Sequence, residues 1–293
     1  MKRFLQQGVS NRTAFQVIGV ILVLLALFVG WRVQAIYARH DGFAERAKDH
    51  KPMRVPLFVD PDQVHYRTRF NFTFDPAEAL AELREAEGLE AIAGSGPDFE
   101  RVVNLLHWTS AQWEPGRPDP YPPFDAKIIL QEIRAGRTGG FCAQYNYVFV
   151  QAVASLGIPA RYVTVVNHEV TEVWIEELDK WVCFDPLHDA YFTDARGTPL
   201  SVYEMSAALR AGEPMTIVGK HRTEDEAKHL QKFRSFAMWL KNDLASSPMN
   251  FADIPHHKVH YVEPGGDLAR VRDPELYTSS VGDLYFDPTR QRR

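Results

Sequence analysis

A run of 19 residues without a charged side chain, from Thr13 to Trp31, is the feature that most constrains the fold. An α-helix of about 20 residues crosses a bilayer core of about 30 Å, and no later run matches this one. The run exceeds the usual apolar region of a signal peptide, which has about 7 to 15 residues, and it is closed by a Trp-Arg pair. The sequence therefore predicts an uncleaved membrane anchor over residues 13–31. Cleavage as a signal peptide after Ala35 is the alternative.

The charges around this run predict its orientation. Lys2, Arg3 and Arg12 precede it, whereas basic and acidic residues are mixed just after it. An excess of basic residues on one side of a span favours the cytoplasm for that side. We therefore expect a single-pass membrane protein with a cytoplasmic amino terminus and a periplasmic or cell-surface domain. The expected organisation is a cytoplasmic stub and anchor over residues 1–35, a juxtamembrane linker over 36–64, a folded domain over 65–222 and a helical or irregular extension over 223–293.

Composition limits the class of the remaining chain. The protein has 293 residues, 45% apolar and 24% charged, which is typical of a folded domain with a sizeable core. All 38 acidic residues but only 28 of the 33 basic ones follow residue 40, so residues 41–293 carry a net charge of −10. A nucleic-acid partner is therefore not expected, since its binding depends on clustered Lys and Arg. The two cysteines, Cys142 and Cys183, make neither a disulfide scaffold nor a four-sulfur zinc site.

Hydrophobic periodicity and turn residues predict an α+β order of elements. The β-rich runs contain Val, Ile, Thr, Tyr and Trp, and the helical runs have apolar residues three, four and seven apart. The expected strands are 65–74, 160–166, 168–176 and 180–184; the expected helices are 75–86, 98–113, 125–136 and 142–156, followed by one amphipathic stretch over 223–244.

The residues that could carry chemistry lie between 136 and 186. Cys142 opens a helix directly after a glycine-rich turn, where the helix start favours a thiolate and predicts a pKa below that of a free thiol. A thiol nucleophile needs a base, and an imidazole base needs a group that orients it. His168 begins one predicted strand and Asp185 ends the next. If these strands form a hairpin, the two side chains can meet over the thiol.

These residues resemble the transglutaminase-like superfamily, which is related to papain-type cysteine peptidases. The resemblance rests on five motifs over residues 104–190: Gly140 with Cys142, the string from Gly157 to Val163, His168 with Thr171 to Val173, Trp181, and Asp185 with Pro186. It implies a papain-like, transglutaminase-like α+β domain in which an antiparallel sheet packs on the helix bearing the nucleophilic cysteine. It also implies a catalytic triad of Cys142, His168 and Asp185.

Two details of the resemblance concern the neighbours of His168. The family usually has Trp two positions after this histidine, and the chain has Val170 there. A competing alignment places the family's Trp on Trp174 and Glu172 in the position of the histidine, which would leave the domain inactive. Glu172 is about 13 Å along the strand from His168 and is otherwise expected to be a structural acceptor.

The resemblance also implies a residue that stabilises the oxyanion of the reaction. Trp108 matches the family's oxyanion-stabilising tryptophan, and Gln112 and Trp113 are alternatives for that task.

No metal or other cofactor is expected. The segment from His168 to Glu172 resembles part of a zinc-peptidase motif, but that motif requires a helix and these residues favour a strand. His256, His257 and His260 lack a Cys or acid at ligand spacing and are expected in a solvated loop. Cys183 is expected to be a buried thiol, with a regulatory disulfide to Cys142 as the alternative.

The sequence thus predicts a membrane-anchored cysteine enzyme that acts on peptide or protein amides, by hydrolysis or by transfer to an amine. The alternative is an inactive domain that uses the same cleft to bind peptide or cell-envelope material. A membrane-tethered assembly protein is a third class, favoured only by the acidic ectodomain.

Overall fold

The computed structural model describes residues 72–220, 225–242, 258–264 and 277–289. The predicted anchor over 13–31, the stub over 1–35 and the linker over 36–64 lie outside these residues. Within the described ranges, no helix has both the length and the apolar character needed to cross a membrane.

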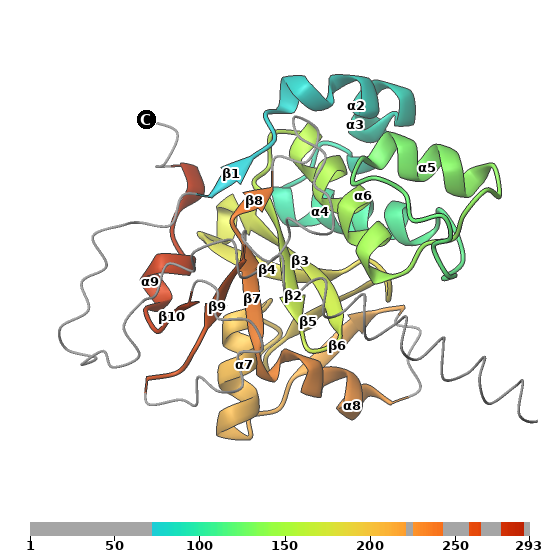
Figure 1. The fold of residues 1–293 in the computed structure, drawn as a ribbon. Coiled ribbons are helices and arrows are strands. Elements are labelled where there is room, and N and C mark those ends of the chain that lie inside the picture. The colour runs from blue at the N-terminus through green and yellow to red at the C-terminus, as the bar shows by residue number, and fades with distance from the viewer. Residues whose placement is uncertain (1–71, 221–224, 243–257, 265–276, 290–293) are drawn as a thin grey trace, which may run out of the picture. The chain divides into compact units, whose positions relative to one another are not determined.

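An eight-stranded sheet forms the centre of the domain (Figure 1). Its order is β10-β9-β7-β2-β3-β4-β5-β6, and every neighbouring pair is antiparallel except β10 with β9. Its strands are β2 Ala160–Val165, β3 His168–Ile175, β4 Lys180–Asp185, β5 Ala190–Thr193, β6 Thr216–Gly219, β7 Phe236–Trp239, β9 Lys258–Tyr261 and β10 Tyr277–Thr278. A separate parallel pair is formed by β1 Thr73–Phe74 and β8 Lys241–Asn242.

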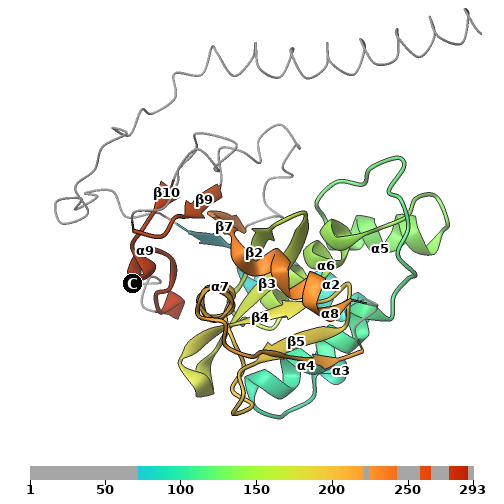
Figure 2. The same ribbon diagram turned by 90° about the horizontal axis from the view of Figure 1, so that it is seen from below.

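The helices cover both faces of this sheet. The described helical elements are η1 Ala77–Leu80, α2 Ala81–Glu87, α3 Leu89–Ala93, α4 Asp98–Ser110, α5 Ala126–Arg134, α6 Cys142–Ser155, η2 Glu176–Leu178, α7 Val202–Ala211, α8 Glu226–Leu230, η3 Gln231–Arg234 and α9 Val281–Leu284. In Figures 1 and 2, α2 to α6 gather beside one face and α7 lies beside the other.

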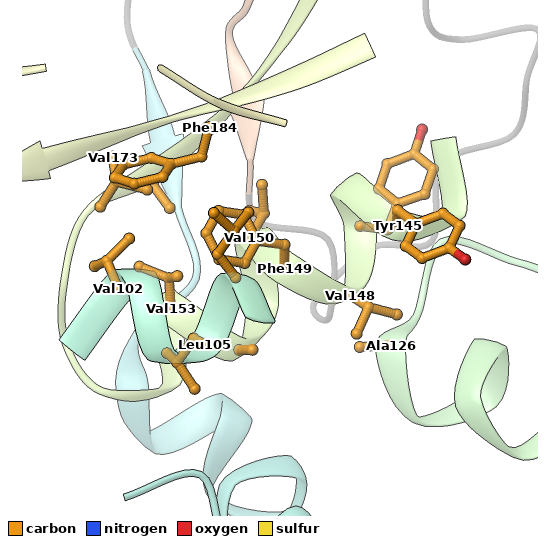
Figure 3. Close-up of a cluster of buried hydrophobic side chains, with 14 of the residues drawn as sticks. Val102, Leu105, Ala126, Tyr145, Val148, Phe149, Val150, Val153, Val173 and Phe184 are labelled. Carbon is orange, nitrogen blue, oxygen red and sulfur yellow. The ribbon is translucent and has the colours of Figure 1, made fainter. Parts of the chain in front are cut away.

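Alternate residues of each strand supply two different cores, because successive side chains of a strand point to opposite faces. Val173 of β3 and Phe184 of β4 pack with α4 and α6 (Figure 3). Val170 of β3 and Cys183 of β4 pack instead with α7 and the carboxyl-terminal elements. Helix α6 is buried along nearly its whole length from Ala143 to Ser155, so it is the central helix of the first core.

Most predicted elements between residues 75 and 186 are confirmed. Asp125 caps α5 as expected, since its carboxylate accepts from the backbone N–H groups of Lys127 and Ile128. The strands β3 and β4 form the predicted hairpin, with Thr171 opposite Phe184. Of the predicted strand over 65–74, only β1 and Phe72 lie within the described residues.

The described part of the predicted carboxyl-terminal extension contains both short helices and strands. Within the described residues 225–242 of the stretch 223–244, η3 ends at Arg234, Ser235 has extended backbone, and β7 then enters the sheet between β2 and β9. All four residues of β7 are buried because both of its faces are covered. Since β9 and β10 join the same sheet, the described residues after 222 complete the domain rather than extend it.

Candidate active site

The loop before helix α6 approaches its neighbours closely at Gly139 and Gly140, where a side chain would not fit. A Cβ on Gly140 would lie 2.7 Å from Ile133 and 2.8 Å from the indole nitrogen of Trp113. The carbonyl of Gly140 accepts from Gly116 N at 2.8 Å and from Trp113 Nε1 at 3.3 Å. These contacts fix the loop, and the Cys142 side chain is left partly exposed at the first residue of the helix.

Asn146 connects the start of α6 to strand β3. Its Nδ2 donates to the carbonyls of Cys142 and Glu169, both at 2.8 Å, and its Oδ1 accepts from Thr171 Oγ1 at 2.7 Å. The Cys142 sulfur also receives a hydrogen bond from the backbone N–H of Glu169. The thiol therefore lies against the residue that follows His168. Sequence analysis did not single out Asn146, which is a buried polar residue one helical turn after Cys142.

The prediction of a lowered pKa for Cys142 is wrong. Burial raises the pKa of this thiol to about 12, and the nearby carboxylate of Glu169 adds to the rise. The backbone N–H groups of Glu169 and Ala143 favour the thiolate, but burial outweighs them. Burial also raises the pKa of Glu169 to about 7. The free protein therefore holds Cys142 as a thiol at neutral pH.

His168 and Asp185 form a hydrogen-bonded pair across the β3–β4 hairpin, as the sequence predicted. The distance from His168 Nε2 to Asp185 Oδ2 is 2.7 Å, and the two side chains are 3% and 0% exposed. Burial opposes the charge of Asp185, but His168 holds the pKa of this carboxyl well below its usual range. Among the hydrogen bonds of the described residues, none joins His168 to the Cys142 sulfur. The structure thus brings the imidazole and carboxylate together and places the thiol beside their strand.

Two further histidines surround this pair. His229 of α8 places its Nε2 3.2 Å from Asp185 Oδ2. His188, which follows β4, lies with its ring centroid 4.5 Å from that of His229 and 5.4 Å from that of His168. Burial lowers the pKa of His188 to about 4. Sequence analysis missed both residues, since neither belongs to a motif and the two are brought together only by the tertiary fold.

Glu172 is a structural residue, as expected. Its carboxylate accepts from Arg161 Nη2 at 2.6 Å, from Val202 N at 2.7 Å and from Tyr285 Oη at 2.9 Å. Both charged side chains of the Arg161–Glu172 pair are 0% exposed. These three partners account for the burial of the Glu172 carboxylate without a role as a catalytic base. This argues against the competing alignment. Residues 168–172 lie in strand β3, whereas a zinc-peptidase motif requires a helix.

The oxyanion candidates have different surroundings. The Trp113 indole donates to Gly140 O, and the Gln112 amide donates to Trp108 O at 2.8 Å. Trp108 is partly buried and packs against the first core. Its role as an oxyanion donor stays a prediction.

The remaining residues that the sequence singled out lie elsewhere. Val170, where the family usually has Trp, is fully buried in the second core, and Cys183 is a buried free thiol. Of the three histidines at 256, 257 and 260, only His260 lies within the described residues, in β9.

The structure thus places a cysteine at the start of a buried helix, beside a sheet that carries a buried His–Asp pair. Residues 88–186 match the family model of the transglutaminase-like superfamily, and this part of the chain is a transglutaminase-like domain. Members of this superfamily are typically cysteine enzymes that act on peptides or proteins. Comparison with curated proteins and with solved structures gives no match.

Proposed function

We propose that this protein is a cysteine acyl-transfer enzyme that acts on amide bonds of peptides or proteins. The observation that carries the proposal is the buried hydrogen bond between His168 and Asp185, on the strands beside Cys142. An imidazole held by a buried carboxylate is oriented to accept a proton, and the carboxylate stabilises the imidazolium that forms.

In the proposed reaction the Cys142 sulfur attacks the amide carbonyl, and His168 accepts the thiol proton. The tetrahedral intermediate collapses to a thioester as His168 returns that proton to the leaving amine. Water or a second amine then attacks the thioester, releases the Cys142 thiol and forms a carboxylic acid or a new amide. Since burial raises the pKa of Cys142 to about 12, proton transfer accompanies the attack instead of preceding it.

The proposed enzyme is anchored by residues 13–31, with its domain outside the cytoplasm. Support comes from the uncharged run and from the basic residues that precede it. Fusion of a reporter that is active only outside the cytoplasm after Arg293 should give signal in intact cells. Signal from a cytoplasm-only reporter at the same position contradicts this topology.

Single-turnover acylation by an activated ester tests the proposed chemistry. We expect the full chain to form a thioester at Cys142, whereas Cys142→Ala and His168→Ala form none. Cys183→Ala is the matched control, because this second thiol is buried on the other side of the sheet from α6, and it should acylate like the parent. Acylation that survives in Cys142→Ala, or depends on Cys183, contradicts the proposal.

A second candidate is a noncatalytic domain that binds peptide in the same cleft. It is favoured by the raised pKa of Cys142 and by the lack of a hydrogen bond from its sulfur to His168 among the described residues. Under this candidate neither the activated ester nor an amide acylates the folded parent protein. The acylation assay therefore decides between the two.

A further inference from the structure

The buried side chains around Asp185 form a group with the chemistry of metal ligands. His168, Asp185, His188 and His229 each offer one ligand atom, and these four atoms all lie within 4.8 Å of one another. All four residues are buried. They come from the start of β3, the end of β4, the connection after β4, and α8. Four segments of the chain thus converge on one small volume.

Several polar atoms of this group have no hydrogen-bond partner among the described residues. They are Asp185 Oδ1, His188 Nδ1 and His229 Nδ1, while His229 Nε2 lies 3.2 Å from Asp185 Oδ2. A buried polar atom without a partner costs about 1–3 kcal/mol, so native proteins rarely keep several in one place. The apolar neighbours of His229, Phe192 and Phe233, supply no partner. These lone pairs point to a ligand that the protein atoms do not supply.

We propose that His168, His188, His229 and Asp185 form a binding site for one divalent transition-metal ion, with Zn²⁺ as the best match. Imidazole nitrogens and a carboxylate oxygen are usual zinc ligands, and four of them complete a tetrahedron. With zinc–ligand distances of about 2.0–2.1 Å, the ligand atoms of a tetrahedral site lie about 3.3 Å apart. The widest pair in the group therefore has to approach by about 1.5 Å when the ion binds.

Such a site has a consequence that rests on the proposed function. A bound ion takes a ring nitrogen of His168 and the carboxylate of Asp185, both of which the acyl-transfer mechanism uses. Zinc binding would therefore inhibit acylation, and the metal-free protein would be the active form. His188 and His229 are the residues that distinguish this site from an ordinary Cys-His-Asp triad.

Equilibrium dialysis of the full chain in detergent, after treatment with EDTA, tests the binding. We expect one Zn²⁺ per chain, and visible absorption bands of tetrahedral Co²⁺ when cobalt is substituted. His188→Gln and His229→Gln should each lower the affinity at least 100-fold. His107→Gln is the matched control, since His107 pairs with Asp189 outside the group at 2.6 Å and should leave binding unchanged. Circular dichroism checks that each variant folds.

X-ray absorption of the zinc-loaded parent gives a readout that needs no variant. The expected first shell contains only nitrogen and oxygen, with the outer scattering of imidazoles. A sulfur in this shell, or binding lost in Cys142→Ala and kept in His229→Gln, overturns the site. So does a stoichiometry below one half, or equal affinity in the parent and both histidine variants.

The acylation assay, repeated with and without one equivalent of Zn²⁺, keeps the two proposals separate. We expect zinc to slow acylation by the parent at least tenfold and to have little effect on His188→Gln. A metal-free parent that never acylates contradicts the proposed enzyme but leaves the dialysis result standing. A parent that acylates but does not bind zinc contradicts the metal site alone.

Discussion

Two buried carboxylates on adjacent strands of the sheet have opposite surroundings. Glu172 of β3 has Arg161, Val202 and Tyr285 as hydrogen-bond partners. Asp185 of β4 has one oriented hydrogen bond, to His168, while its Oδ1 has no partner among the described residues. Both are 0% exposed. A fully satisfied buried charge holds a fold together, whereas an incompletely satisfied one marks a place where the protein acts on something else.

The largest expected effect is the loss of acylation when Asp185 is substituted. Asp185→Asn keeps the shape of the side chain but can hold His168 in the wrong tautomer, so acylation should fall about 10⁴-fold. Single-turnover acylation measures the rate, and a urea melt confirms that the variant folds. The matched control is Asp189→Asn, which alters the neighbouring carboxylate paired with His107 and should keep most of the rate. Equal losses in both variants would contradict a specific role for Asp185.

Glu172→Gln should lower stability and leave the acylation rate of the folded protein unchanged. Removing one partner of a buried ion pair leaves Arg161 uncompensated, and the expected loss in unfolding free energy is about 3–5 kcal/mol. Urea denaturation measures this loss, with the exposed Glu176→Gln as the control. The fraction of the variant that remains folded should acylate at the parental rate. If Glu172→Gln is as stable as the parent but inactive, the roles of the two carboxylates are reversed.

Asn146→Ala should affect both properties, because Asn146 joins α6 to β3. The substitution leaves the Cys142 and Glu169 carbonyls without this donor, at an expected cost of about 1–3 kcal/mol in unfolding free energy. It also frees the thiol to move relative to His168, so the acylation rate should fall. Asn104→Ala is the control, since it removes a hydrogen bond to Ala93 away from Cys142 and should lower stability alone. Unchanged acylation in Asn146→Ala would show that this connection does not position the thiol.

The smallest expected effect is a pH dependence from Glu169. Its pKa rises from 4.5 to about 7 on folding, so the unfolded chain releases this proton at lower pH than the folded one. Stability should therefore fall as pH rises from about 4.5 to about 7. The change should be on the order of 1 kcal/mol, below the full value of the shift, because Glu169 as a whole residue is only half-buried. Urea midpoints across this range, compared with those of Glu169→Gln, measure it. An identical pH dependence in the variant contradicts the assignment.

The difference between the two carboxylates could be predicted only in part from the sequence. The β3–β4 hairpin is a local feature, so its pattern was enough to bring His168 to Asp185. The partners of Glu172 come from residues 161, 202 and 285, and no local pattern connects the last two to β3. His229 was missed for the same reason, since it reaches Asp185 only because η3 leads into a strand that pairs with β2.

The strand β7 shows why local patterns fail there. Leu230, Phe233 and Ala237 are spaced as on one face of a helix, yet the chain turns at Ser235 and the following residues are buried on both faces of the sheet. The pKa of Cys142 was mispredicted because the helix start is visible in the sequence, whereas the burial that outweighs it depends on the packing of β3.

The segment 277–289 has a consequence for the order in which the chain matures during synthesis. The Leu284 carbonyl accepts from Arg161, Tyr285 donates to Glu172, and the Phe286 carbonyl accepts from Trp181 Nε1 at 2.9 Å. These partners are 105 to 123 positions apart in the chain. A ribosome therefore makes strands β2 to β4 and the proposed triad long before it makes the residues that complete the hydrogen bonds of the Arg161–Glu172 pair. Until the segment from Tyr277 onward has been translated, the nascent domain carries an arginine and a glutamate that are still missing their last partners.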